Sequence, residues 1–173
     1  MSHNRVAIIE VMGRDCGDIA LTVSMAVGAD YVLVPEVQYD CPFDQDNMIA
    51  RLNYLRDRGK KYGLVVIAEG VENQYRHPAS QLRQILQDRT DFDVRASTLG
   101  HMQRGGYPTM SDRRLAIEMG ARGIHLLADG VGNRVIGIKN NRVFDQDIME
   151  ALKVERSFNT EMYDLFNKLA SNR

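Results

Sequence analysis

Three potential cations and a glycine pair stand close together in the stretch VRASTLGHMQRGGYP, residues 94–108. Arg95, His101 and Arg104 can carry positive charge, and the glycines that follow can bring backbone N–H groups close to a ligand. The guanidinium group of arginine matches the oxygens of a phosphate. The composition of this stretch therefore indicates an anion-binding loop.

Two other stretches carry groups of the same kind. Arg14 follows Met12 and Gly13 directly after an apolar run, and Glu69 stands before a glycine at the end of another. Ligands of open α/β sheets bind outside the carboxyl ends of the strands, so these loops are expected to share one edge. A carboxylate accepts hydrogen bonds from hydroxyl groups, and the cations beside it suit a phosphate. The set favours a phosphorylated polyol as the ligand.

Each of these residues also has a simpler interpretation. A single arginine in a loop is most often a solvated surface group. His101 alone is more often a hydrogen-bonded structural histidine than a ligand contact. The glycine pair serves equally well in a turn. The stretch MGRDCG lacks both the dinucleotide-binding spacing and the Walker lysine pattern. The functional hypothesis therefore depends on the combination of residues.

The elements that must position these loops alternate between strands and helices. The sequence predicts strands at 5–11, 31–37, 64–70 and 93–99. It predicts helices at 19–28, 45–63 and 78–90. Pro35 is expected to shorten the second strand, Gly28 to end the first helix, and Pro78 to begin the third. This alternation predicts an α/β fold, a mostly parallel sheet with helices on both faces.

The later part of the chain shows a different pattern. A long amphipathic helix is predicted at 111–130, followed by a hairpin over 134–144 that turns at Asn140-Asn141. Two more helices are predicted at about 147–154 and 159–170.

Composition excludes several classes of protein. The chain has 173 residues, and its 22 basic and 23 acidic side chains give a formal net charge of −1, so no overall field attracts nucleic acid. Cys16 and Cys41 have neither metal-ligand spacing nor the pattern of a disulfide framework. No signal-peptide pattern opens the chain, and its apolar runs are too short for a membrane span. We expect a cytoplasmic protein with no nucleic-acid, membrane or metal partner.

Taken together, these stretches resemble the bacterial ATP-dependent 6-phosphofructokinases. The resemblance rests on RVAIIEVMGRDCGD, VLVPEV, GKKYGLVVIAEG and VRASTLGHMQRGGYPTMSDRRLAIEMG, in that order and spacing. Enzymes of this family use magnesium and transfer the γ-phosphoryl group of ATP to the 1-hydroxyl of fructose 6-phosphate in glycolysis. The resemblance implies the C-terminal, sugar-phosphate-binding half of such an enzyme, a Rossmann-like lobe with part of the second lobe retained without its partner.

The resemblance also implies roles for individual residues. The positions that match the family's contacts to fructose 6-phosphate are Met12, Gly13, Glu69, His101 and Arg104. Arg14 resembles the catalytic arginine that stabilises charge on the transferring phosphoryl group. Arg5 and Arg95 resemble arginines that reach the 6-phosphate bound to a neighbouring subunit.

A second set resembles part of the family's effector site, which binds ADP or phosphoenolpyruvate between subunits. The matching positions are Gly28, Asp30, Arg58 and Lys60. Asp30 stands where the family often has glutamate, Arg58 where it often has lysine, and Tyr62 where it often has histidine. These differences change the reach of the side chains and leave the effector response open.

The family's ATP-binding and catalytic-aspartate motifs, GGDxPGxN and TIDND, have no counterpart in this sequence. Phosphoryl transfer needs a base and a metal, so the chain alone is expected to be inactive. ATP, magnesium and a homotetramer are expected only of the complete enzyme. The expected organisation is a sugar-phosphate lobe at 2–102, a segment at 103–151 that packs on an ATP-binding lobe, and a C-terminal helix at 152–173 that returns to the sugar lobe.

The segment at 103–151 is expected to expose apolar side chains, with self-association, rearrangement or mobility of the segment as the consequence. The candidates are Leu115, Ile117, Met119, Ile124, Leu126 and Leu127. Two alternatives stay open at this point. One is a fragment of a diphosphate-dependent phosphofructokinase. The other is a non-catalytic module that binds a sugar phosphate or complements a separately encoded half.

Overall fold

The computed structural model describes residues 4–40, 45–73, 78–155 and 157–171. The chain divides into two compact units, of which the first comprises residues 1–105 and 158–173 and the second residues 106–157. Cys41 lies outside the described residues. No helix in the described ranges combines the length and the apolar character that a membrane crossing requires.

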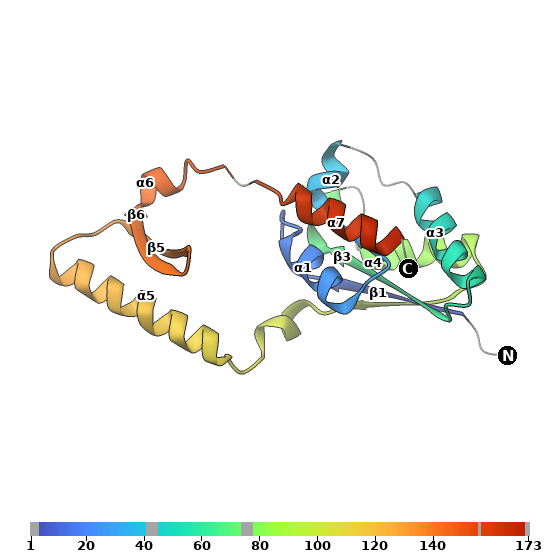
Figure 1. Ribbon diagram of the computed structural model, residues 1–173, viewed down its shortest axis with the longest axis horizontal. Helices are drawn as coiled ribbons and strands as arrows, with labels where there is room; N and C mark the ends of the chain where they lie inside the picture. Colours follow the sequence, from blue (N-terminus) through green and yellow to red (C-terminus); the bar gives the residue numbers. More distant parts are fainter. Residues whose placement is uncertain (1–3, 41–44, 74–77, 156, 172–173) are drawn as a thin grey trace. The chain divides into compact units, whose positions relative to one another are not determined.

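A four-stranded parallel sheet forms the centre of the first unit (Figure 1). Its strands are β1 (Arg5–Val11), β2 (Tyr31–Leu33), β3 (Tyr62–Ala68) and β4 (Asp93–Thr98), in the order β2-β3-β1-β4. In the register of the sheet, Arg5 lies opposite Tyr62 on one side and Asp93 on the other. The inner strands are nearly continuous apolar runs because both faces of the sheet are covered.

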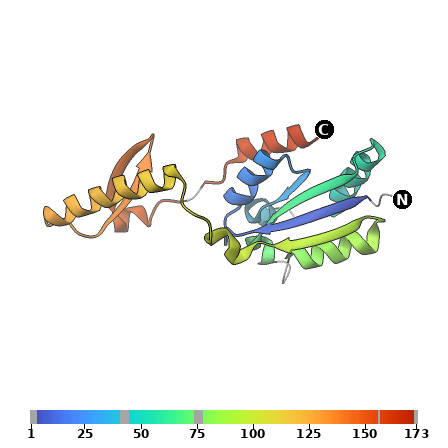
Figure 2. The same ribbon diagram turned by 90° about the horizontal axis from the view of Figure 1, so that it is seen from below.

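Helices cover the two faces of this sheet. They are α1 (Asp18–Val27), α2 (Pro35–Asp40), α3 (Gln45–Asp57), α4 (Pro78–Arg89) and α7 (Thr160–Ser171). Figure 2 shows α1 and α7 on one face and α4 on the other. Ile8 of β1, Leu21 of α1 and Leu86 of α4 are fully buried in the core between these layers. The predicted α/β fold is confirmed.

The second strand ends before Pro35, as the sequence predicts. Within the stretch 31–37, β2 ends at Leu33, and Pro35 begins α2, a helix that the sequence did not predict. Proline favours the first helical position because its φ is already helical and its missing N–H needs no partner there. Glu36 of this helix accepts the N–H of Gly17 with both carboxylate oxygens, at 2.8 and 3.0 Å, and so fixes the start of α1.

The loops after β3 and β4 are short 3₁₀ helices. The strand predicted at 64–70 ends at Ala68, and η1 (Glu69–Asn73) follows it. The strand predicted at 93–99 ends at Thr98, and η2 (Gly100–Arg104) begins two residues later. The charged residues expected at the carboxyl ends of the strands therefore lie on tight turns.

The second unit consists of a helix and a hairpin. Its elements are α5 (Met110–Ala128), β5 (Arg134–Lys139), β6 (Arg142–Asp147) and α6 (Ile148–Ala151). The hairpin turns at Asn140 and Asn141, as predicted, with φ angles of 52° and 58° that asparagine tolerates well. The helix predicted at 147–154 is α6, which ends at Ala151.

The hairpin side of α5 is covered within this unit. Leu126 is buried, and Leu115 and Met119 are half-buried. Their spacing places them on the same face as Gly123, where an added Cβ would lie 3.3 Å from Cδ1 of Ile136 on β5. Contrary to the expectation, Leu126 is not exposed, and Leu115 and Met119 are only partly exposed, because the unit itself covers this face of the helix. Ile117, Ile124 and Leu127 are exposed, as the sequence predicts.

Candidate functional site

The loop after β1 is held by side chains from two other loops. Oε1 of Glu69 accepts the N–H of Gly13 at 3.1 Å and that of Arg14 at 2.7 Å. Oε1 of Gln103 accepts the N–H of Met12 at 2.8 Å. Three consecutive backbone donors are thus satisfied by protein groups rather than left to face a ligand.

Two glycines allow the backbone segments to approach each other closely. A Cβ on Gly70 would lie 1.7 Å from the carbonyl oxygen of Arg14, and one on Gly13 would lie 2.2 Å from that of Cys16. Arg14 itself has a φ of 50°, in the left-handed region that non-glycine residues seldom adopt. The loop is therefore held in a constrained conformation by its neighbours.

These loops line a pocket of about 410 Å³ at the carboxyl ends of the strands. The lining residues are Met12, Gly13, Arg14, Ile19, Glu69, Gln103 and Arg104. The volume falls in the range of small-molecule sites, about 300–1,000 Å³. Five of the eight residues that the sequence predicts for the substrate site meet here, and all of them belong to the first unit.

Two arginines line this pocket without a partner among the described residues. The side chains of Arg14 and Arg104 are exposed, and neither guanidinium makes a hydrogen bond or ion pair with any described residue. Glu69 is the one carboxylate in the lining, so the pocket carries an excess of positive charge. Two unpaired guanidinium groups on one small pocket suit a phosphate-bearing ligand.

The remaining predicted substrate residues lie away from this pocket. His101 is exposed on η2 but does not line it. Arg5 and Arg95 instead flank Asp93, whose Oδ2 lies 3.5 Å from Nε of Arg5 and 3.6 Å from Nη2 of Arg95. Arg95 lies opposite Ala7, four residues before the end of β1, which is about 13 Å of strand. Arg95 therefore lies inside the length of the sheet and not at the edge that carries the pocket.

Two lining residues are absent from the sequence prediction. Gln103 carries no charge, so its importance follows only from the hydrogen bond to Met12. Ile19, near the start of α1, is 43% exposed and adds an apolar side chain to the rim. The position of Gln103 directly before Arg104 is the one signal in the sequence that points to it.

The residues predicted for an effector site are engaged with one another or with neighbours. Asp30 is fully buried, pairs with Nζ of Lys60 and accepts the N–H of Leu64 at 2.9 Å. Nη1 of Arg58 donates to the hydroxyl of Tyr54 at 2.8 Å. Within the first unit, the charged groups expected to face an effector are thus in contact with protein groups, and the guanidinium of Arg58 also lies 5.6 Å from the centre of the Tyr54 ring.

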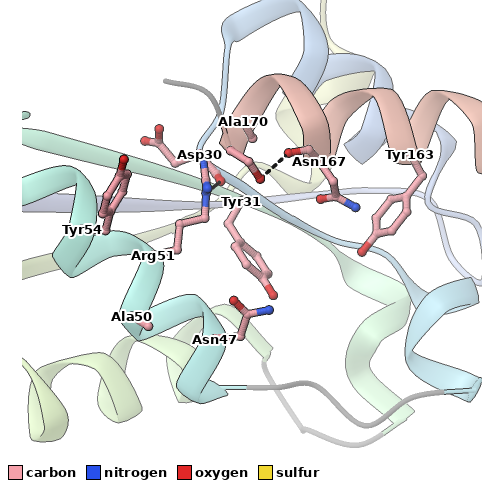
Figure 3. A pocket seen from close by; sticks show the side chains of 10 residues that line it. Asp30, Tyr31, Asn47, Ala50, Arg51, Tyr54, Tyr163, Asn167 and Ala170 are labelled. Carbon is pink, nitrogen blue, oxygen red and sulfur yellow. Dashed lines mark hydrogen bonds between the residues drawn. The ribbon is translucent and has the colours of Figure 1, made fainter.

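A second pocket of about 450 Å³ lies beside Asp30, between α3, the start of β2 and the end of α7 (Figure 3). Nε of Arg51 donates to the backbone carbonyl of Asp30 at 3.0 Å on its wall. Gly28, Arg58 and Lys60 do not line this pocket. Asp30 is thus the single member of the predicted effector set that the structure brings to it.

The described residues do not fit a magnesium–ATP site. In the ranges that the structure describes, no three histidine, cysteine, aspartate or glutamate side chains gather closely enough to hold a metal ion. The one carboxylate on the first pocket, Glu69, uses Oε1 for the backbone of residues 13 and 14. No step through magnesium or ATP is assigned to these residues.

The family profile and the most similar relatives reported below are all phosphofructokinases. The sequence profile of the phosphofructokinase family matches residues 1–127. The chain is 45% identical over 168 residues to ATP-dependent 6-phosphofructokinase 1 of Clostridium perfringens, an alignment that covers 97% of this chain and 50% of the relative. It is 44% identical over 169 residues to the ATP-dependent 6-phosphofructokinase of Bacillus cytotoxicus, covering 98% and 50%. The chain therefore spans about half the length of these relatives.

Solved structures agree on the fold. The phosphofructokinase of Saccharomyces cerevisiae matches with a TM-score of 0.76 and 31% identity, over 99% of this chain and 23% of that one. A pyrophosphate-dependent phosphofructokinase from Marinobacter aquaeolei matches with a TM-score of 0.72 and 21% identity, over 92% and 43%. The second likeness is evidence for the shared fold alone.

Proposed function

Since the chain belongs to the phosphofructokinase family, we propose that it supplies the fructose 6-phosphate site of an ATP-dependent 6-phosphofructokinase. The observation that carries this proposal is that Arg14 and Arg104, whose guanidinium groups have no partner in the described part of the chain, line one pocket with Glu69. A phosphorylated sugar offers anionic oxygens to the arginines and hydroxyl groups to the carboxylate. The similarity to ATP-dependent 6-phosphofructokinases and the chemistry of the pocket both support this ligand.

Glu69 has two roles in this proposal, one in fixing the loop after β1 and one in binding the ligand. Its Oε1 fixes the backbone of residues 13 and 14, while Oε2 has no hydrogen-bond partner among the described residues. That second oxygen is available to accept a sugar hydroxyl. Met12, Gly13 and His101 are proposed as further sugar contacts, with His101 moving toward the ligand when it binds.

Arg14 is proposed as the catalytic residue. A guanidinium remains charged at any physiological pH and can stabilise the negative charge on a transferring phosphoryl group. The backbone of Arg14 is fixed by Glu69 on one side and by close contact with Gly70 on the other. A cation on a fixed backbone needs little rearrangement when charge develops.

Arg5 and Arg95 are proposed to bind the 6-phosphate held by a neighbouring subunit. Their side chains are 66% and 73% exposed, so a docked subunit has access to both. Asp93 lies between them and leaves one net positive charge on the group. We also propose that the complete enzyme is a homotetramer and that it responds to ADP or phosphoenolpyruvate.

We further propose that the chain alone does not transfer phosphoryl groups. Its described residues offer neither a base beside the pocket other than Glu69 nor a cluster of carboxylates for magnesium. Residues 103–151 are proposed to pack on an ATP-binding lobe that supplies these groups. A coupled assay with ATP, magnesium and fructose 6-phosphate tests this, since robust turnover by the purified chain contradicts it. A diphosphate donor in place of ATP is tested in the same assay.

Calorimetric titration of the purified chain with fructose 6-phosphate tests the sugar site directly. We expect saturable binding that is lost in Arg104→Ala and retained in Arg83→Ala. Arg83 is a matched control because it is an exposed arginine of α4 that does not line the pocket. Inorganic phosphate is the second titrant and is expected to bind more weakly, because it lacks the sugar hydroxyls. A folded chain that binds no fructose 6-phosphate, or an Arg104→Ala variant with unchanged affinity, contradicts the proposal.

A further inference from the structure

The two unpaired arginines of the pocket stand on different loops. Arg14 follows β1, whereas Arg104 ends η2, the turn that follows β4. Two guanidinium groups bind one anion tightly when their loops already have a fixed separation. If the loops are mobile, binding must order them, and this costs conformational entropy. The structure must therefore hold η2 against the loop after β1.

Leu99, directly before η2, donates its N–H to the carbonyl oxygen of Glu10 at 3.0 Å, but η2 itself is weakly packed. None of its residues is buried, and Met102 is 73% exposed. A turn with so little buried apolar surface belongs to the least stable parts of a fold. A specific polar contact is needed to keep Arg104 in position.

One hydrogen bond provides this contact. Oε1 of Gln103 accepts the N–H of Met12 at 2.8 Å, across 91 positions of sequence. In the described part of the chain, no other hydrogen bond joins residues 12–14 to residues 100–104. Gln103 is adjacent to Arg104, and Met12 is two residues from Arg14. The bond thus joins the two loops that carry the arginines.

We propose that Gln103 is a positioning residue that clamps η2 to the loop after β1, so that Arg14 and Arg104 reach one anion together. The inference rests on the proposed fructose 6-phosphate site. Glu69 cannot take over this role, because it fixes residues 13 and 14 to η1 and makes no hydrogen bond to η2 among the described residues. The clamp adds affinity through preorganisation rather than through a contact of its own with the ligand.

Two substitutions of Gln103 distinguish loss of the hydrogen bond to Met12 from other effects of changing the side chain. Gln103→Met keeps the length of the side chain and removes the carbonyl acceptor, while Gln103→Glu keeps an acceptor oxygen in the same place. Gln103 is exposed, so both variants are expected to fold, which circular dichroism verifies. The first readout is the hydrogen-exchange rate of the Met12 amide, measured by NMR on the full chain.

We expect the Met12 amide to exchange about tenfold faster in Gln103→Met and no faster than wild type in Gln103→Glu. The amides of Gly13 and Arg14, which Glu69 holds, serve as internal controls and are expected to stay unchanged. If the hydrogen-exchange rate of the Met12 amide is unchanged in Gln103→Met, the proposal that Gln103 holds η2 in place is wrong. A general loss of structure would raise all three rates together.

The second readout is calorimetric titration with fructose 6-phosphate. We expect Gln103→Met to lower the affinity about tenfold, because Arg104 is no longer held beside Arg14. Faster Met12 exchange with unchanged affinity overturns the positioning role while leaving the substrate site intact. A folded wild-type chain that binds no fructose 6-phosphate overturns the proposed function, and the positioning role with it. The failures of the two proposals are therefore distinguishable.

Discussion

The carboxylate of Glu69 accepts the backbone N–H of Arg14 at 2.7 Å and thereby ties the turn after β3 to the loop after β1. The same residue, Arg14, turns its carbonyl oxygen to the next residue of that turn, Gly70. The peptide groups of Arg14 are thus held from both sides, which allows its φ of 50° to persist. The position of this arginine in the pocket follows from backbone contacts rather than from its own side chain.

Gly70→Ala is expected to disrupt this arrangement. A Cβ at residue 70 would lie 1.7 Å from the carbonyl oxygen of Arg14, a separation that backbone atoms relieve only by moving apart. The Glu69–Arg14 hydrogen bond then breaks, and the affinity for fructose 6-phosphate is expected to fall at least about tenfold. Gly120→Ala is the control, because nothing lies within 4 Å of a Cβ there and alanine favours a helix. Calorimetry on both variants tests the expectation, which equal affinities contradict.

Lys60→Met is expected to destabilise the first unit. Lys60 pairs with Asp30, a carboxylate with no exposed surface, so the substitution leaves a buried charge with only the N–H of Leu64 to stabilise it. Removing one partner of a fully buried pair costs about 3–5 kcal/mol. We expect about 2 kcal/mol here, because the Lys60 side chain keeps 25% exposure and water partly replaces it.

Chemical denaturation of the first unit measures this change in the free energy of unfolding. Lys61→Met is the matched control, because Lys61 is exposed and makes no contact of this kind with a described residue. A similar small change in both variants contradicts the structural role of the Asp30–Lys60 pair. It would instead favour Lys60 as a residue kept for binding an effector.

The order of elements was predictable because local signals specify it. The apolar runs of β1 and β3, the left-handed Gly28 that ends α1 and the asparagine pair of the hairpin each depend on a few neighbouring residues. The early end of the second strand at Pro35 was predictable for the same reason, but α2 was not. Proline suits both the end of a strand and the first turn of a helix, so the sequence alone does not show that a helix begins there.

The charged residues of the candidate site could be predicted from the sequence, but the hydrogen bonds between its loops could not. Arg14, Glu69 and Arg104 follow strands of a parallel sheet, so topology alone brings them to one edge. Glu69 and Gln103 accept the backbone N–H groups of the first loop, and no residue type in the sequence predicts these contacts. A hydrogen bond across 91 positions leaves no pattern in a single sequence, which is why Gln103 was missed.

Asp145 is expected to make the stability of the second unit depend on pH. Hydrogen bonds from Arg122 and then from Arg134 hold the pKa of this carboxyl below its ordinary value. The folded unit therefore keeps the carboxylate charged at a pH where the unfolded chain binds a proton. The stabilisation is complete above the ordinary value of about 3.9 and is lost as the pH falls through the lowered pKa.

Asp145→Asn is expected to lower the melting temperature of this unit at pH 7, and the difference from wild type is expected to shrink below about pH 4. The melting temperatures of both proteins are measured between about pH 3 and pH 7, with hydrogen exchange of the β5 and β6 amides as the signal for this unit. Glu155→Gln removes an exposed carboxylate that makes no ion pair with a described residue and is expected to have little effect. A difference for Asp145→Asn that is independent of pH contradicts the ion-pair explanation.

The face of α5 that points away from the hairpin is expected to drive self-association of the isolated chain. Ile117 and Ile124 stand two turns apart on this face and are 72% and 66% exposed, and Leu127, one turn further, is 69% exposed. Burying each such side chain against a partner is favourable by about 1.5–3 kcal/mol. In a complete enzyme, the proposed partner is the ATP-binding lobe; in its absence, a second copy of the chain is expected to cover the face.

Sedimentation velocity over a range of concentrations tests this expectation. The wild-type chain is expected to form dimers or larger species, and the double variant Ile117→Ser/Ile124→Ser is expected to shift toward monomer without unfolding, because both side chains already face solvent within the unit. Val27→Ser is the control, since Val27 is an apolar residue of α1 that is 55% exposed and lies outside this face. If the wild-type chain is monomeric at every concentration, or the double variant associates as strongly as wild type, the exposed face of α5 is not the surface through which copies meet.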